Sequence, residues 1–396
     1  MKHVSTLPPQ DWMKAAETKA VMGALEAAGG EGAALFVGGC VRNALLGETV
    51  GDIDIATKLV PEEVVQRLEA AGIKNIPTGI EHGTITAIAN GKSFEITTLR
   101  KDVETDGRRA VVAFSENWLD DAQRRDFTMN TLLADINGQI YDPLGRGLKD
   151  LQARRVIFVG DPVQRIAEDH LRILRFFRFY ALYAEGAPDE AALEACRNGA
   201  GKIPSLSRER ITQEFFKILS VDDPVNILKI MFENNVLKEF SPPEYNPELL
   251  EHLCRFQNNY GLGFVASRLL VLAGFEDKNI KAFEQLLLIP KVFKKDMEAM
   301  SRILALPDLN EDHAVKVAVY KHGRVPSAQA LMIELAQDRV MNGYALKALE
   351  IIQNWDVPNF PVSGEDLIKK GASQGPKLGR ELQRLEEEWI ERGFVD

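Results

Sequence analysis

One stretch, residues 35–57, constrains the fold more than any other part of the chain. It opens with an apolar run that predicts a short strand, and Gly38-Gly39 interrupts that run. A segment with helical spacing follows and ends at Gly47. Paired glycines at a strand-to-helix turn let backbone N–H groups approach an anion closely, and the helix N-terminus adds partial positive charge. The pattern therefore predicts a phosphate-binding turn.

A second strand is predicted directly after this helix, over residues 52–55. Because strand side chains alternate between faces, Asp52 and Asp54 point the same way. Two carboxylates on one rigid face can hold a hard divalent cation. Taken alone, such a pair is more often a solvated edge, and paired glycines are more often an ordinary turn. Their combination within one supersecondary unit indicates phosphoryl or nucleotidyl transfer.

This stretch resembles the signature of nucleotidyltransferases of the DNA polymerase β type. Within that superfamily it is most similar to the class II tRNA nucleotidyltransferases and bacterial poly(A) polymerases, whose first motif reads GGxVRD and then GDxDxxT. Asn43 stands where this family usually has Asp, which keeps a hydrogen-bonding group but loses a charge. The resemblance implies that Asp52 and Asp54 bind Mg²⁺, with Mn²⁺ as the alternative, and catalyse the reaction. It also implies that Gly39 and Arg42 contact the nucleotide.

Two further motifs of the family follow in the expected order. The predicted strand 93–98 carries Glu95 within F-E-I-T-T-L-R, which resembles the family's [YF]-E-[VI]-T-T-[FY]-R. Glu95 is either a solvent-facing strand residue or a third catalytic acid near the attacking hydroxyl. The run RRDFTMN resembles the family's RRDFT-x-N, which implies nucleotide contacts for Arg125, Asp126 and Asn130 and a role in choosing ribonucleotides.

A helix is predicted over residues 166–181, with an apolar stripe and a neighbouring row of arginines. Such a helix is often an ordinary amphipathic helix with a basic surface. Its start resembles the family motif E-D-x-x-R, which implies that Asp169 and Arg172 pair with the edge of the incoming base. A carboxylate accepts from an exocyclic amine and a guanidinium donates to acceptors, so the pair suits CTP and ATP. Arg175 and Arg178 would lie behind this pair and either hold the triphosphate or orient the pair.

The net charge of −10 argues against a nucleic-acid partner when it is taken alone. Net charge averages over all surfaces, however, and phosphate contacts need only a local basic stripe. Four arginines form the expected stripe: Arg165, Arg172, Arg175 and Arg178.

We expect an α+β fold, with a head built on a small, mixed, largely antiparallel sheet and an all-α remainder. Residues 101–121 read as a flexible loop with one short strand, 110–114. The expected parts are a leading helix (1–30), the nucleotidyltransferase head (31–148), a neck for base recognition (149–220), a body (221–355) and a tRNA-binding tail (356–396).

The cellular setting is predicted from cysteine use and hydropathy. Three cysteines far apart, Cys40, Cys196 and Cys254, favour a reducing cytoplasm without disulfides or structural zinc. No apolar run is long enough for a membrane span, and the N-terminus lacks the apolar core of a signal peptide. No stable protein partner is inferred.

The leading hypothesis is a metal-dependent enzyme that adds C, C and A to the tRNA 3′ end from CTP and ATP, releasing pyrophosphate. Alternatives are a poly(A) polymerase, a CC- or A-adding specialist of the same family, and an inactive RNA-binding or nucleotide-sensing protein. The run TGIEHGT at 78–84 resembles the family's tRNA enzymes rather than its poly(A) enzymes, which carry a basic segment there.

Overall fold

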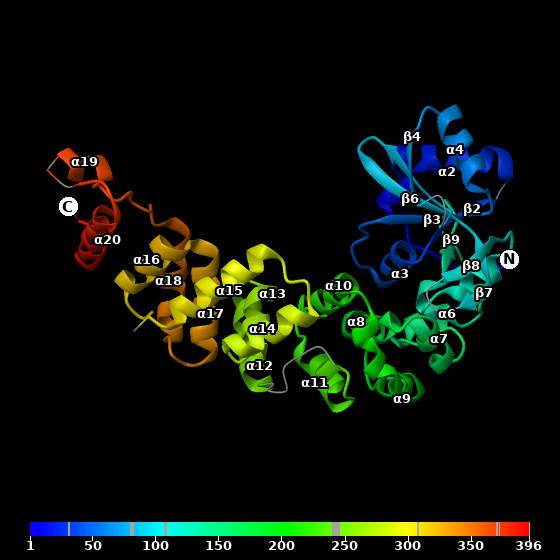
Figure 1. Cartoon of the computed structure of the whole chain (residues 1–396). Coiled ribbons are helices and arrows are strands. Elements are labelled where there is room, and N and C mark those ends of the chain that lie inside the picture. Colours follow the sequence, from blue (N-terminus) through cyan, green and yellow to red (C-terminus); the bar gives the residue numbers. More distant parts are fainter. Residues whose placement is uncertain are drawn as a thin grey trace. The chain divides into compact units, whose positions relative to one another are not determined.

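The computed structural model describes residues 1–30, 32–79, 83–106, 109–239, 246–306, 309–369, 371 and 373–395. The chain divides into two compact units, Met1–Phe215 with Ile230–Glu239, and Phe216–Lys229 with Phe240–Asp396. The described part of the first unit contains every assigned strand, and that of the second is helical (Figure 1). No helix in the described ranges is both long and apolar enough to cross a membrane.

The head is built on an eight-stranded sheet with the order β1-β10-β9-β2-β3-β6-β5-β4. Its strands are β1 (His3–Thr6), β2 (Ala34–Val37), β3 (Ile53–Thr57), β4 (Lys74–Gly79), β5 (Thr84–Ala89), β6 (Lys92–Thr98), β9 (Leu133–Ala134) and β10 (Gln139–Tyr141). β3 and β6 are parallel, whereas the other neighbouring pairs are antiparallel. The expected mixed sheet is confirmed, but it is larger than predicted because β1, β9 and β10 extend one edge.

Period-two alternation gives the sheet one apolar face and one polar face. Phe36, Ile55 and Ile96 are fully buried on one face. Asp54 and Glu95 lie on the other, where Glu95 is exposed. Helices α2 (Ala16–Gly29) and α4 (Pro61–Ala70) pack against strands of this sheet and supply the cover that the apolar face needs. The carboxylates are therefore left on the face available to a ligand.

The helix after the glycine turn matches its prediction, and the expected leading helix is present but interrupted at Ala15. α3 (Gly39–Leu46) ends at Gly47, which adopts the left-handed conformation expected of a glycine that terminates a helix. The N-terminal segment holds β1 and two helices, α1 (Asp11–Lys14) and α2, because Ala15 between them is extended with ψ 141°. This segment is thus part of the head sheet and its cover.

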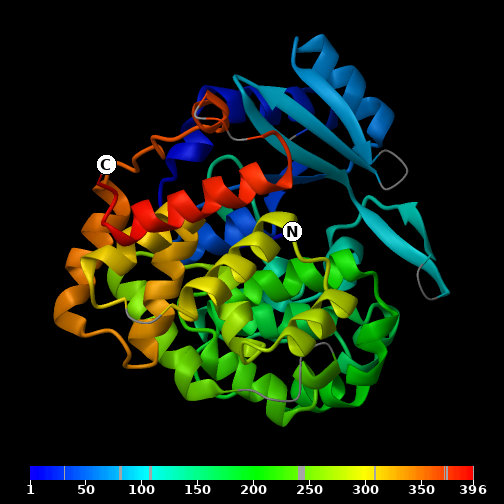
Figure 2. The ribbon, with the colours of Figure 1, turned by 60° about the vertical axis from the view of Figure 1, so that its left-hand side comes forward.

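The segment expected to be a loop with one strand is more regular than predicted. It forms a two-stranded antiparallel ribbon, β7 (Arg100–Asp106) and β8 (Arg109–Phe114), separate from the main sheet (Figure 2). Helix α5 (Trp118–Arg124) follows, and Asn117 caps it by accepting a hydrogen bond from the Leu119 N–H. The high polarity of this segment concealed its regularity in the sequence.

The neck follows β10 and consists of five α-helices in the described chain. These are α6 (Gly147–Gln152), α7 (Pro162–Glu168), α8 (Leu171–Tyr183), α9 (Glu190–Gly199) and α10 (Arg208–Leu219). The helix predicted over 166–181 is broken, because Asp169 is extended with φ −153° and ψ 105°. The Asp169 carboxylate accepts a hydrogen bond from the Leu171 N–H at 3.1 Å and so starts α8.

An aromatic cluster fixes the start of the neck against the segment after α5. The Phe127 ring lies 4.9 Å from that of Phe158 and 5.0 Å from that of Phe179, and Phe158 stacks on Phe176 at 5.8 Å between centroids. Phe127, Phe158 and Phe176 are at most 2% exposed. Because Phe127 is anchored here, its neighbour Asp126 is held beside α8.

The second unit contains helices α11 to α20, the first of which begins there and ends in the other unit. They are α11 (Val225–Glu233), α12 (Pro247–Tyr260), α13 (Val265–Leu272), α14 (Asp277–Leu286), α15 (Lys291–Leu304), α16 (Asp312–His322), α17 (Arg324–Ala336), α18 (Asn342–Asn354), α19 (Gly364–Lys369) and α20 (Pro376–Glu391). α17 is buried from Pro326 onward and packs against α12, α15 and α18. Residues 240–245, before α12, lie outside the described residues.

We predict that Gly147→Ala destabilises the first unit. A Cβ at Gly147 would lie 2.6 Å from the Thr128 carbonyl oxygen, a backbone atom that cannot move aside cheaply. The expected loss is about 1–3 kcal/mol in urea unfolding. Gly23→Ala is the matched control, because Gly23 is exposed inside α2 with no atom within 4 Å of the added carbon. It should gain about 0.5–1 kcal/mol. Equal effects of the two substitutions would contradict the close approach at Gly147.

Candidate active site

The glycine turn lies directly against a carboxylate and an arginine. Gly38 has φ 72°, a conformation that favours glycine. A Cβ at Gly38 would lie 3.6 Å from Arg125 Nη1 and 3.9 Å from Asp54 Oδ2. The glycine turn, the Arg125 guanidinium and the Asp54 carboxylate therefore meet at one point, and a side chain at Gly38 would fill the space between them.

The carboxylates predicted to act together are neighbours. Asp54 lies opposite Glu95 in the parallel pairing of β3 with β6, and Asp52 is exposed just before β3 begins. Burial and then the charge of Glu95 raise the pKa of Asp54 to about 6, and Asp52 adds to this rise while Arg125 opposes it. The ionised form of Asp54 is thus held in an environment that lacks sufficient positive charge.

The donor set fits a magnesium ion shared with a substrate. Among the described residues, no three His, Cys, Asp or Glu side chains gather into a complete cation site. Mg²⁺ is usually held by one or two carboxylates together with substrate phosphates and water. Asp52 and Asp54 can supply those two carboxylates, and the burial and neighbouring negative charge that raise the pKa of Asp54 make an environment in which a cation would be stabilised.

Arg125 is held in place for a contact with phosphate. It follows the last residue of α5, and its Nε and Nη2 donate to Asp121 Oδ2 at 3.0 and 2.8 Å. The Asp121 side chain is only 5% exposed, so this anchor is firm. Those bonds leave Nη1 directed toward Gly38, where a phosphate on the turn would lie.

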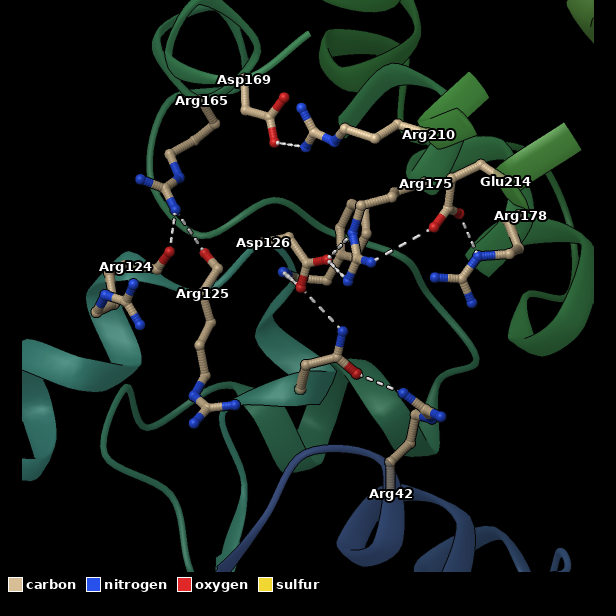
Figure 3. Close-up of polar contacts among 12 residues, drawn as sticks. Arg42, Arg124, Arg125, Asp126, Arg165, Asp169, Arg175, Arg178, Arg210 and Glu214 are labelled. Carbon is tan, nitrogen blue, oxygen red and sulfur yellow. Dashed lines mark hydrogen bonds and ion pairs between the residues drawn. The ribbon is translucent and has the colours of Figure 1, made fainter. Parts of the chain in front are cut away.

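Asp126 is the centre of a buried hydrogen-bond network (Figure 3). Its Oδ1 accepts from the Phe127 N–H at 2.8 Å and from Asn130 Nδ2 at 2.9 Å. Its Oδ2 accepts two bonds from Arg175, at 2.8 and 2.5 Å. Burial would raise the pKa of Asp126, but Arg175 and Asn130 outweigh it and hold this pKa below its usual range. The acceptor capacity of the carboxylate is thus fully used.

Arg42 extends this network to the helix that follows the glycine turn. Its Nη1 donates to Asn130 Oδ1 at 2.6 Å, and its Nη2 donates to the Tyr183 hydroxyl at 2.7 Å. The guanidinium also lies 4.1 Å from the centre of the Tyr183 ring. Arg42 is 7% exposed, and a second hydrogen bond from Nη2 reaches Asn43. It therefore joins α3 to α8, whatever contact it makes with a nucleotide.

The two residues predicted to recognise the base lie at the break between α7 and α8. Asp169 Oδ2 accepts from Arg210 Nη2 at 2.7 Å, and its side chain is 33% exposed. Arg172 Nη1 donates to Glu168 Oε2 at 2.6 Å and to the Arg165 carbonyl at 2.7 Å. These bonds hold both side chains while leaving part of each hydrogen-bonding edge unused.

The four arginines expected to form an open basic stripe are instead each paired with a carboxylate. Arg165 and Arg172 share Glu168, Arg175 binds Asp126, and Arg178 binds Glu214 at 2.5 Å. Their exposed side-chain fractions range from 8% to 31%. Arg172, Arg175 and Arg178 share α8, as the sequence pattern indicated, whereas Arg165 and its partner Glu168 lie on α7. The pattern did not show Asp126 and Glu214, which come from other elements.

Cys40 is buried beside the glycine turn. Its thiol donates to the carbonyls of Val37 and Asp54 at 3.3 and 3.6 Å, and burial raises its pKa to about 11. All three cysteines are free and buried.

Several supporting residues were not predicted as part of the site. Tyr183 clamps Arg42, Arg210 holds Asp169, and Glu214 binds Arg178. Arg210 and Glu214 both belong to α10. The run 78–84 cannot be assessed, because residues 80–82 lie outside the described residues.

The glycine turn, the strand carboxylates and the adjoining helical neck are the arrangement of a nucleotidyltransferase. The chain matches the family model described as "Poly A polymerase head domain" over residues 34–157. It also matches "Probable RNA and SrmB- binding site of polymerase A" over residues 187–249.

Relatives that match nearly the whole chain show to which family within this class it belongs. The "CCA tRNA nucleotidyltransferase 1, mitochondrial" of Mus musculus is 35% identical over 366 residues, covering 91% of this chain and 83% of the relative. The "CCA-adding enzyme" of Leuconostoc citreum is 32% identical over 402 residues, covering 98% and 94%. The crystal structure of the Bacillus stearothermophilus CCA-adding enzyme in complex with CTP has a TM-score of 0.79 at 25% identity, covering 97% and 94%. The chain belongs to the family of CCA-adding tRNA nucleotidyltransferases.

We predict that Asp54→Asn stabilises the metal-free protein at pH 7.5. Folding raises the pKa of Asp54 from 3.8 to about 6, so its contribution favours the folded state at low pH and is lost as pH rises through about 6. At pH 7.5 the ionised carboxylate costs up to about 3 kcal/mol, and the neutral amide avoids this cost. Urea unfolding with a chelator present should show a gain of about 1–3 kcal/mol at pH 7.5 and little gain at pH 4.

Glu69→Gln, which removes an exposed acid from α4, is the matched control and should change stability little at either pH. An Asp54→Asn protein no more stable than wild type at pH 7.5 would contradict the crowding of charge at this position.

Proposed function

We propose that this protein adds C, C and A to the 3′ end of tRNA without a nucleic-acid template, using CTP and ATP and releasing pyrophosphate. The observation that carries the proposal is the meeting of the Gly38 turn, Asp54 and Arg125 at one point, beside a neck that presents Asp169 and Arg172. Kinship with CCA-adding enzymes over nearly the full chain supports it. We further propose the head, neck, body and tail boundaries given above, a tail that binds tRNA, and a cytoplasmic location.

Each part of the site would contribute one step. Asp52 and Asp54 would hold Mg²⁺ or Mn²⁺, which when bound supplies Lewis-acid stabilisation of the reacting phosphate. The Gly38-Gly39 turn, the first N–H groups of α3 and Arg125 would bind the triphosphate. Glu95, on the same face as Asp54, would orient the attacking hydroxyl.

The neck would choose the base. Asp169 would accept from the exocyclic amine of cytosine or adenine, and Arg172 would donate to the neighbouring acceptor. Arg175 and Arg178 would lie behind Asp169 and Arg172 and position them. Arg175 is itself held by Asp126, and Arg178 is held by Glu214. Asp126 would reach the ribose only by exchanging one of its present partners, because both of its oxygens are engaged.

The function is tested with three tRNA transcripts, which end before CCA, after CC and after CCA. Each is incubated with one labelled nucleotide at a time, and the products are sequenced. The proposal predicts CMP on the first, AMP on the second and no addition to the third. Long adenosine tails on every transcript would identify a poly(A) polymerase, and addition of only CMP or only AMP would identify a specialist.

Asp52→Asn and Asp54→Asn should each lower CMP and AMP incorporation by more than a hundredfold, because both would lose a charged oxygen ligand of the cation. Binding of tRNA, measured by gel shift, should remain. Activity within tenfold of wild type in either variant would remove that residue from the proposed metal site.

Asp169→Ala should weaken discrimination against UTP and GTP. A wrong base leaves buried polar groups unpaired at a cost of about 1–3 kcal/mol, so selectivity should fall by roughly 5- to 150-fold. Steady-state kinetics with all four nucleotides on the CC-ended transcript measures this. Glu209→Ala is the matched control, since Glu209 is exposed beside Arg210 on α10. A uniform loss of rate with unchanged nucleotide ratios would show that Asp169 is structural.

A further inference from the structure

The Asn43 side chain lies between the buried guanidinium of Arg42 and the backbone carbonyl of Thr49. Its Oδ1 accepts hydrogen bonds from Arg42 Nε at 3.1 Å and Arg42 Nη2 at 2.9 Å. Its Nδ2 donates to the Thr49 carbonyl at 3.1 Å. The side chain therefore accepts on one side and donates on the other.

Only an amide meets both requirements at this position. A carboxylate accepts hydrogen bonds but cannot donate when ionised. An aspartate at position 43 would keep the bonds from Arg42, yet it would turn an anionic oxygen toward the Thr49 carbonyl. The residue that departs from the family motif is thus matched to its two partners in this chain.

Thr49 belongs to the short segment that delivers Asp52 to the site. This segment, residues 47–52, runs from the end of α3 to the start of β3 and is mostly exposed. Asn43 holds it twice, because its backbone carbonyl also accepts from the Glu48 N–H at 2.9 Å. One ion pair supplements these bonds, between Glu48 and Arg154 at 3.7 Å.

On its other side, Asn43 contacts Arg42, which belongs to the buried hydrogen-bond network around Asp126. Arg42 is fixed by Asn130 and by the Tyr183 hydroxyl, and Asn130 is in turn bound to Asp126. The same hydrogen-bond network therefore holds both the 47–52 segment and α8 in position.

We propose that Asn43 is a positioning residue for Asp52, acting through the Thr49 carbonyl, and that the amide is required because it alone links this carbonyl to Arg42. This inference rests on the proposed function, in which Asp52 is a metal ligand. It assigns a task to a residue that makes no contact with the reacting atoms.

The test compares Asn43→Asp with Tyr183→Phe. The first keeps the acceptor for Arg42 and removes only the donor to Thr49. The second removes another partner of Arg42, together with the 3.5 Å hydrogen bond from the Tyr183 hydroxyl to Asn43 Oδ1, but keeps the donor from Asn43 to Thr49. Amide hydrogen exchange in the metal-free protein should be about fivefold faster or more over residues 49–53 in Asn43→Asp, as expected for loss of one hydrogen bond. Exchange there should be unchanged in Tyr183→Phe.

Mn²⁺ affinity is the second readout. The dissociation constant, measured by water-proton relaxation, should rise about fivefold in Asn43→Asp and stay at the wild-type value in Tyr183→Phe. Asn43→Ala, which loses the acceptor for Arg42 as well as the donor to Thr49, should match or exceed Asn43→Asp in both measurements and serves if the aspartate variant folds poorly.

Wild-type exchange and Mn²⁺ affinity in Asn43→Asp would overturn the inference. So would equal effects of Asn43→Asp and Tyr183→Phe, because the segment would then depend on Arg42 rather than on the amide. A wild-type protein that binds no Mn²⁺ would instead refute the metal site itself, and with it the proposed function.

Discussion

The ion pair between Asp126 and Arg175 is the interaction on which the rest of the site depends. It joins the segment after α5 to α8, and Asn130 carries the connection onward to Arg42 and α3. Removing one partner of a buried pair typically costs about 3–5 kcal/mol, because the other charge is left uncompensated. The residues proposed to recognise the base, at the start of α8, and the glycine turn at the start of α3 are therefore held by one network.

The site combines carboxylates in two opposite states. Asp126 has four donors around it, and its pKa is held low. Asp54 faces Glu95 and Asp52, and its pKa is raised to about 6. The first arrangement stabilises the fold, whereas the second costs stability unless a cation arrives. Strain of this kind is expected where a protein binds its ligand rather than where it only folds.

The parts of this site that could be predicted from sequence are those set by local geometry. The glycine turn and the strand alternation that places Asp54 and Glu95 on one face follow from a few neighbouring residues. The break at Asp169 was missed because apolar periodicity continues through it, while a single side-chain cap to Leu171 interrupts the helix. The pairing of Arg175 and Arg178 could not be read from α8 alone, since Asp126 and Glu214 lie 49 and 36 residues away in the chain.

Binding of a divalent cation at Asp54 is tested most directly by counting protons. Calorimetric titration of Mn²⁺ into the protein at pH 6, in two buffers of different ionisation enthalpy, measures the protons released on binding. With a pKa of about 6 for Asp54, about half a proton should be released per site at pH 6 and almost none at pH 8. Asp54→Asn should release none at either pH. Binding by the wild-type protein without proton release at pH 6 would contradict the account.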